Sequence, residues 1–166
     1  MKYWEKIGTV NILWVEMEIF SNGDTACSSE VFWYNKDWIK LWMNYQCVQL
    51  ARVFYYKITW KDSYKICKDL NSSCWFKWRK KLDIDEIMYD DIKVGDMVVF
   101  SWWVHWHIAL ISQVVTDWFF IVQQNFFNNK KDINHFISFQ DVIDNNAIID
   151  PNWAEYFIED FLRIKK

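Results

Sequence analysis

The sequence predicts an α+β fold in which one helix packs on an antiparallel β-sheet. A chain of 166 residues, 52% of them hydrophobic, can bury one sizeable core but is short for a second full domain. Apolar positions after residue 46 recur with a helical period, and short segments after residue 95 alternate as strands do. No repeat, linker or low-complexity segment divides the chain, so residues 1–166 are expected to form a single domain.

The first half of the chain is expected to contain an extended region, a loop and the main helix. Residues 8–20 are rich in β-forming residues, and turn residues mark 21–43 as loop-rich. In the helix that follows, Asn44 is a good N-cap residue. Four apolar positions lie i+3, i+4, i+7 and i+8 from Cys47, at Leu50, Ala51, Phe54 and Tyr55. One face of this helix is therefore expected to be buried.

The second half is expected to supply the sheet. Residues 62–92 have an irregular, partly helical pattern. Strand-like segments with short connections follow at about 96–101, 107–115, 119–124 and 135–139. Asp150 as N-cap and Pro151 at the first helical position predict a terminal helix over about 150–164.

Charge and apolar patterns argue against several functions. The formal net charge of −3 does not suit a general nucleic-acid surface, and the basic run at 77–82 is followed at once by acidic residues. The apolar run at 97–111 contains two histidines and is shorter than the roughly 20 residues that span a membrane. The first ten residues lack the features of a signal peptide. We therefore expect a cytoplasmic protein with no membrane span and no nucleic-acid partner.

The four cysteines are expected to be free thiols in a reducing compartment, because a core of this size needs no disulfide staples. They stand at Cys27, Cys47, Cys67 and Cys74. Cys67 and Cys74 are seven residues apart, which is not a CxxC spacing, so packing is their expected role.

The composition is unusual in having three glycines and thirteen tryptophans, where ordinary usage of about 7% glycine would give roughly 12. Trp118 follows Asp117 in a predicted hairpin turn, at a position that favours glycine because it requires a positive φ. Trp102, Trp103 and Trp106 would similarly give a glycine-rich loop if they were Gly. Our interpretation is a reassigned UGA codon, read as tryptophan where the source reads glycine. A protein that is truly rich in tryptophan is the alternative.

Cys47 is the candidate nucleophile. If Asn44 caps the helix, Cys47 lies in its first turn, where unpaired N–H groups and the positive end of the helix dipole stabilise a thiolate. The same N–H groups could stabilise an oxyanion. The alternative is an ordinary buried cysteine on the apolar face of the helix.

His107 is the candidate base, because it begins the alternating segment "HIALI" at a strand start. Pairing across the following turn brings residues 123–125 level with residues near 110, so Gln123 or Asn125 could orient the imidazole. A hydrogen-bonded sheet histidine is the alternative. A zinc site formed by His105 and His107 with His135 or a cysteine is the chemical competitor, although no third ligand has a recognisable spacing.

These residues carry a family resemblance. The segments "YQCVQLARVF", "VGDMVVF", "HIALI" and "VQQN" resemble the CHAP family of cysteine amidases and peptidases, which has a papain-like α+β fold. Within it, the chain is most similar to the amidase domain of glutathionylspermidine synthetase/amidase. The resemblance covers about residues 7–125 and is most specific around 45–54 and 95–125. Family members have glycine where this chain has Trp38, Trp42 and Trp106, which supports the codon interpretation.

The resemblance implies roles for the site residues. Cys47 would be the nucleophile and His107 the general base, with Gln46 and the Cys47 backbone N–H as oxyanion donors and no metal or cofactor. The family motif Glu-Gln-Asn reads Gln123-Gln124-Asn125 here. Replacing Glu by Gln removes a charge that would stabilise an imidazolium, so either activity is reduced or Asn125 takes the orienting role. Tyr45 and Arg52 could line or brace the cleft, with a surface position as the alternative.

The implied substrate is an amide of one of two kinds. The first is a peptide–polyamine amide such as glutathionylspermidine, and the second is a peptidoglycan peptide, which would suit a phage-type enzyme released to the cell wall. The alternative function is a catalytically impaired CHAP-like module that binds a peptide or a partner.

Overall fold

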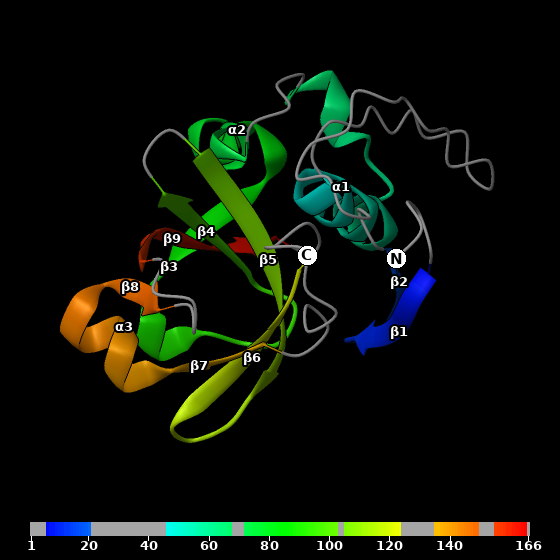
Figure 1. The fold of residues 1–166 in the computed structure, drawn as a ribbon. Coiled ribbons are helices and arrows are strands. Elements are labelled where there is room, and N and C mark those ends of the chain that lie inside the picture. Colours follow the sequence, from blue (N-terminus) through cyan, green and yellow to red (C-terminus); the bar gives the residue numbers. More distant parts are fainter. Residues whose placement is uncertain are drawn as a thin grey trace.

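An antiparallel β-sheet forms the centre of the fold (Figure 1). The computed structural model describes residues 6–20, 46–67, 72–102, 105–123, 135–149 and 155–165. Among these, seven strands join in the order β3-β9-β4-β5-β6-β7, with β8 paired to β9, and each pairing is antiparallel. The strands are β3 (Ile84–Ile87), β4 (Met97–Trp102), β5 (His105–Val114), β6 (Trp118–Val122), β7 (His135–Ser138), β8 (Ala147–Ile149) and β9 (Glu155–Ile164).

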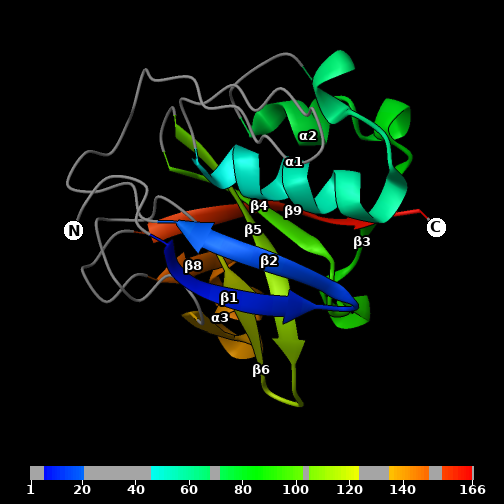
Figure 2. The same cartoon turned by 90° about the vertical axis from the view of Figure 1, so that its right-hand side faces the viewer.

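A β-hairpin and a helix cover one face of this sheet. The hairpin joins β1 (Lys6–Ile12) to β2 (Val15–Phe20), and the helix is α1 (Gln46–Thr59). Figure 2 shows them side by side in front of the sheet, and α1 contacts both β2 and β5. The shorter helical segments are η1 (Ser63–Lys65), α2 (Ser73–Lys77), η2 (Arg79–Leu82), η3 (Tyr89–Asp91) and α3 (Phe139–Asn145).

The sheet is buried on both faces. On β5, Ile108 and Leu110 pack into the core shared with α1 and the hairpin, whereas Ala109 and Ile111 pack into a second core. The alternation of side chains along a strand produces this division. The apolar run at 97–111 therefore belongs to two buried strands, and no helix among the described residues is long and apolar enough to cross a membrane.

The α+β class is confirmed, as are most of the predicted elements. Extended residues 8–20 form the hairpin, and α1 and strands β4 to β7 occur where the periodicity predicted them. The irregular region 62–92 contains the expected helical turns and, in addition, strand β3. Helix α3 and strand β8 were not predicted either. Strands of three or four residues are too short to produce a recognisable alternation. The predicted loop at 21–43 and the cap residue Asn44 lie outside the described residues.

The predicted terminal helix is wrong, because Glu155–Ile164 forms strand β9 between β3 and β4. Opposite β4, the register shifts by one residue between Val99 and Phe100, so β9 contains a bulge. Ile158 and Phe161 consequently face the same core although they are three residues apart. This spacing imitates a helical period, since a bulge inserts one extra residue into the two-residue repeat of a strand. Asp150 and Pro151 lie outside the described residues.

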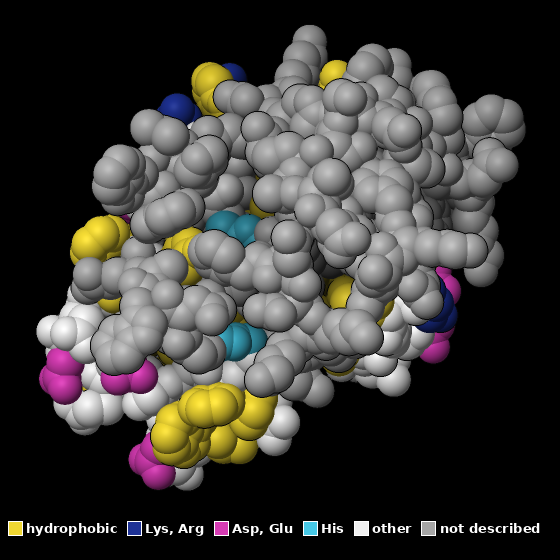
Figure 3. Space-filling model, viewed as in Figure 1, with side chains coloured by type: hydrophobic (Ala, Val, Ile, Leu, Met, Phe, Trp, Pro, Cys, Tyr) yellow, Lys and Arg dark blue, Asp and Glu magenta, His cyan; other side chains and the backbone are white. Residues whose placement is uncertain are grey.

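The predicted turn at Trp118 is also wrong. The N–H of Val115 donates to the Trp118 carbonyl (2.9 Å), so the two central residues of the turn are Thr116 and Asp117. Trp118 begins β6 and is not among the residues with positive φ. Its ring packs edge-on against Phe136, with 5.3 Å between centroids. Both rings are exposed, and Figure 3 shows hydrophobic side chains, in yellow, gathered at the lower edge of the molecule.

A different tryptophan occupies a glycine-type conformation. Trp60 directly follows α1, has φ 59°, and donates its backbone N–H to the Tyr56 carbonyl (2.7 Å). Helices very often end on a left-handed residue at this position, and glycine is the usual choice because it lacks a Cβ. The codon interpretation stays a prediction, and Trp60 rather than Trp118 is the described residue whose backbone supports it.

The cysteine prediction is wrong for two of the four residues. Cys67 and Cys74 form a disulfide, and their Cα atoms are 5.7 Å apart. This separation is within the range that a disulfide requires. Cys47 is a free, buried thiol. Cys27 lies outside the described residues.

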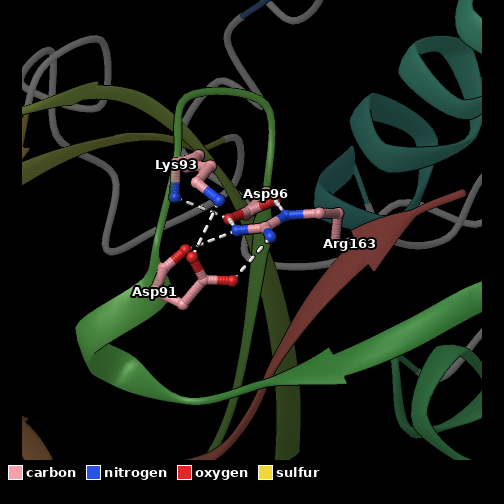
Figure 4. Close-up of polar contacts among 4 residues, drawn as sticks. All are labelled: Asp91, Lys93, Asp96 and Arg163. Carbon is pink, nitrogen blue, oxygen red and sulfur yellow. Dashed lines mark hydrogen bonds and ion pairs between the residues drawn. The ribbon is translucent and has the colours of Figure 1, made fainter. Parts of the chain in front are cut away.

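A polar cluster ties the end of β9 to the chain before β4 (Figure 4). Arg163 on β9 donates from Nε to Asp96 Oδ1 and from Nη2 to Asp96 Oδ2, both at 2.8 Å, and from Nη1 to Asp91 Oδ2 at 2.7 Å. The N–H of Lys93 donates to Asp96 Oδ2 (2.6 Å), and Lys93 Nζ pairs with Asp91 Oδ1. Because the Asp96 side chain is only 3% exposed, this carboxylate depends on these donors in place of water.

Candidate functional site

Helix α1 places Cys47 as predicted. The helix begins at Gln46, so Cys47 lies in its first turn, and its side chain is 2% exposed in the core between α1 and the sheet. The backbone N–H groups of Cys47, Val48 and Ile108 are close enough to Sγ to lower the pKa of the thiol as donors. The hydroxyl of Ser72 is the side-chain partner, with 3.7 Å between Oγ and Sγ. The thiol is therefore surrounded by hydrogen-bond donors from α1, from β5 and from the chain just before α2.

The protonation of the thiol differs from the prediction. Burial raises the pKa of Cys47, while the hydrogen bonds from Ser72 and from the three backbone N–H groups lower it to a smaller extent. The predicted stabilisation by the helix start is present, but removal of the sulfur from water outweighs it. In this resting state Cys47 is accordingly a neutral thiol at neutral pH.

His107 lies on β5, directly before the residue whose backbone contacts the thiol. Its ring packs against Phe100, its partner on β4, with 4.9 Å between centroids. Removal from water lowers the pKa of His107 to about 3, and the nearby side chain of Gln123 raises it in part. The imidazole is thus neutral at neutral pH, which is the form that can accept a proton.

Gln123 lies at the end of β6 and is 1% exposed. The register pairs Leu110 with Val122, within a residue or so of the pairing that the sequence predicted, so Gln123 comes level with Ala109, two residues from His107. Its side-chain amide raises the pKa of His107 in part, although within the described part of the chain neither polar atom of this amide has a hydrogen-bond partner. Gln123 therefore lies near His107, and its role in orienting the imidazole stays a prediction.

The contact between the Cys47 thiol and the His107 imidazole stays a prediction. Cys47 meets β5 through the backbone of Ile108, whereas the His107 ring contacts Phe100 and Gln123. Ser72 is a side-chain partner of the sulfur, with 3.7 Å between Oγ and Sγ.

Arg52 is a buried residue of α1, at 2% exposure, and not the surface residue that was the alternative. Its Nη2 donates to the Cys67 carbonyl at 2.8 Å, and its guanidinium lies over the ring of Tyr64, 5.2 Å from the centroid. Arg52 therefore braces the segment that carries the disulfide.

The other predicted site residues are described only in part or not at all. Gln46 is described as the first residue of α1 and His105 as the first residue of β5, in both cases for the backbone alone. Tyr45 and Asn125 lie outside the described residues. His135 lies on β7 and stacks on Phe136. Within the described ranges, no three His, Cys, Asp or Glu side chains gather in a way that could hold a metal ion.

Sequence reasoning missed Ser72. Its only sequence signal is a serine before a short helical segment, a pattern that predicts a helix cap. Its contact with Cys47 depends on a fold that brings together residues 25 positions apart.

A hollow of about 460 Å³ lies toward the other end of α1, where its lining includes Phe54, Ile58 and Gly95. The charged side chains around it are paired with one another: Lys93 with Asp91, Arg163 with Asp96, and Lys165 with Asp85. Because these charges are paired within the fold, they do not indicate a ligand site. The Cys47 site is therefore the stronger candidate.

No protein-family model matches the chain, and no curated protein matches it at the threshold for a significant relationship.

Proposed function

We propose that the chain is a thiol-dependent amide hydrolase of the CHAP type, with Cys47 as the nucleophile. The observation that supports this most strongly is the position of Cys47 in the first turn of α1, where the unpaired backbone N–H groups of the helix start and the Ser72 hydroxyl are available as donors to Sγ. Donors that stabilise a thiolate can also stabilise the oxyanion of a tetrahedral intermediate. A cysteine that only fills space in a core has no need of this set of donors.

The proposed reaction is acyl transfer in two steps. His107 accepts the thiol proton, Cys47 Sγ bonds to the carbonyl carbon, and the carbonyl π electrons move to oxygen. The C–N bond then breaks as the imidazolium gives its proton to the departing amine. Water attacks the thioester with His107 as base, releases a carboxylic acid and restores the thiol. In this scheme Gln123 orients the imidazole, and the reaction requires no metal or cofactor.

The proposed substrate is a peptide amide, either a peptide–polyamine amide such as glutathionylspermidine or a peptidoglycan peptide. The Cys67–Cys74 disulfide favours the peptidoglycan peptide, because disulfides persist in oxidising environments and are rare in the cytoplasm. A phage-type enzyme released to the cell wall fits this observation better than the cytoplasmic location that we expected from the sequence, where the cysteines would be free thiols.

A catalytically impaired module that binds a peptide or a partner is the second candidate. It is favoured by the neutral Gln123 beside His107, by the lowered pKa of His107 and by the raised pKa of Cys47. Both pKa shifts oppose the transfer of a proton from sulfur to nitrogen.

Mass spectrometry of the reaction products separates the two candidates. Glutathionylspermidine and a muropeptide mixture are offered to the native chain, to Cys47→Ala, and to Ser73→Ala as a control at another buried site. The hydrolase proposal predicts cleavage of one substrate by the native chain and the control, and none by Cys47→Ala. Cleavage that persists in Cys47→Ala excludes Cys47 as nucleophile. If the native chain cleaves neither substrate but binds one in calorimetry, the binding module is correct.

A further inference from the structure

The hydroxyl of Ser72 is used in an unusual way. Ser72 is 0% exposed and stands at the N-cap position of α2, yet its side chain makes no capping hydrogen bond. Its backbone lies in the helical region, with φ −59° and ψ −23°, whereas a capping serine is normally extended and turns its oxygen to an N–H of the first turn. The hydroxyl is instead in contact with Cys47 Sγ.

Two connections hold Ser72 in this position. The disulfide joins Cys67 to Cys74, so Ser72 belongs to a short closed loop. Arg52 Nη2 donates to the Cys67 carbonyl, which fixes the start of this loop to α1. Since Cys47 and Arg52 lie on the same helix, α1 carries the thiol and also anchors the segment that presents the hydroxyl.

The contact has a direction that depends on the state of the thiol. In the neutral thiol either oxygen or sulfur can donate. In the thiolate only the hydroxyl can donate, and hydrogen bonds to an ionised acceptor are roughly twice as strong as neutral ones. In agreement, the Ser72 hydrogen bond is the largest of the effects that lower the pKa of Cys47. The hydroxyl therefore favours the form of Cys47 that reacts.

We propose that Ser72 is a positioning residue for Cys47, and that the Cys67–Cys74 disulfide makes this positioning sensitive to redox conditions. The proposal rests on the proposed function only in treating Cys47 as the reacting group. A dithiol reductant would break the S–S bond, leaving Cys67 and Cys74 as thiols while the reductant becomes a disulfide. Ser72 would then no longer be held by the Cys67–Cys74 link, its hydroxyl could leave Sγ, and Cys47 would become less reactive.

The test follows the rate of Cys47 alkylation by iodoacetamide as a function of pH, by mass spectrometry of the peptide that contains Cys47. The pH midpoint reports the stability of the thiolate, whereas the plateau rate at high pH reports access to the buried sulfur. Ser72→Ala is expected to move the midpoint upward and to slow alkylation at pH 7 about tenfold, the effect of losing one hydrogen bond of about 1.4 kcal/mol. Ser72→Thr keeps the hydroxyl and is expected to restore the native midpoint.

The disulfide is tested with the double variant Cys67→Ser/Cys74→Ser. It should show the same upward shift as Ser72→Ala, and adding Ser72→Ala to it should cause no further shift, because both changes act through one hydroxyl. Ser73→Ala is the matched control at a neighbouring buried serine and should keep the native midpoint. His107 on β5 and Arg52 on α1 are titratable residues on the elements that meet at Cys47, and all variants leave them unchanged.

Two results would overturn the proposal. A native midpoint in Ser72→Ala would remove the positioning role. A native midpoint in the double variant, or a full further shift on adding Ser72→Ala to it, would remove the redox role. Circular dichroism of each variant shows whether it folds. The comparison of Ser72→Ala with Ser72→Thr tests the positioning role in a chain whose disulfide is intact. Alkylation does not require amide hydrolysis, so failure of the proposed function would leave this result interpretable.

Discussion

Replacing Asp96 by Asn should destabilise the fold by about 2–3 kcal/mol. The carboxylate is 3% exposed and accepts three hydrogen bonds, two from Arg163 at 2.8 Å and one from the Lys93 N–H at 2.6 Å. Removing one partner of a buried ion pair costs roughly 3–5 kcal/mol. Arg163 is partly exposed, at 28%, and keeps its bonds to Asp91. The expected loss of stability therefore lies at or below the lower end of this range.

Urea unfolding followed by tryptophan fluorescence measures this loss. In a chain of 166 residues, about 2–3 kcal/mol corresponds to a fall in Tm of roughly 4–12 °C. Asp91→Asn is the matched control: it also contacts Arg163, but its carboxylate is 52% exposed, so little change is expected. A loss for Asp96→Asn below about 0.5 kcal/mol, or equal to that of Asp91→Asn, would refute the view that burial gives this pair its importance.

Three further predictions use other features of the fold. Trp60→Gly should have a free energy of unfolding about 1 kcal/mol higher than that of Trp60→Ala in urea titrations, because only glycine adopts φ 59° without strain. Equal stabilities would contradict this. Burial and the neighbouring Glu86 raise the pKa of Asp160 to about 7 from an ordinary 3.8, so the folded chain binds the extra proton and stability falls as pH rises from about 4 to 7. Asp160→Asn should flatten this dependence in urea titrations at pH 5 and pH 8, and an unchanged slope would exclude Asp160 as its source. Gln123→Glu should raise the pKa of His107 and increase amide hydrolysis about tenfold, since a carboxylate stabilises the imidazolium; an unchanged or slower rate would show that the neutral amide does not limit the reaction.

Local patterns in the sequence determined much of the fold. The helical period placed α1 and put Cys47 in its first turn, and the two-residue period located strands β4 to β7. The short β5–β6 connection was sufficient to predict that Gln123 lies near His107. These predictions succeed because they depend on side chains a few positions apart in the chain, whose spacing is set by the geometry of a helix or a hairpin.

The state of the candidate site was decided by tertiary structure. The protonation of Cys47 depends on how completely the fold removes sulfur from water, which the residues around position 47 do not reveal. The β9 bulge, the Cys67–Cys74 disulfide and the contact of Ser72 with Cys47 likewise join parts of the chain that only the folded arrangement brings together. Burial and long-range contact are properties of the whole packed structure, whereas periodicity and capping are properties of a short segment, and this difference separates what could be predicted from what could not.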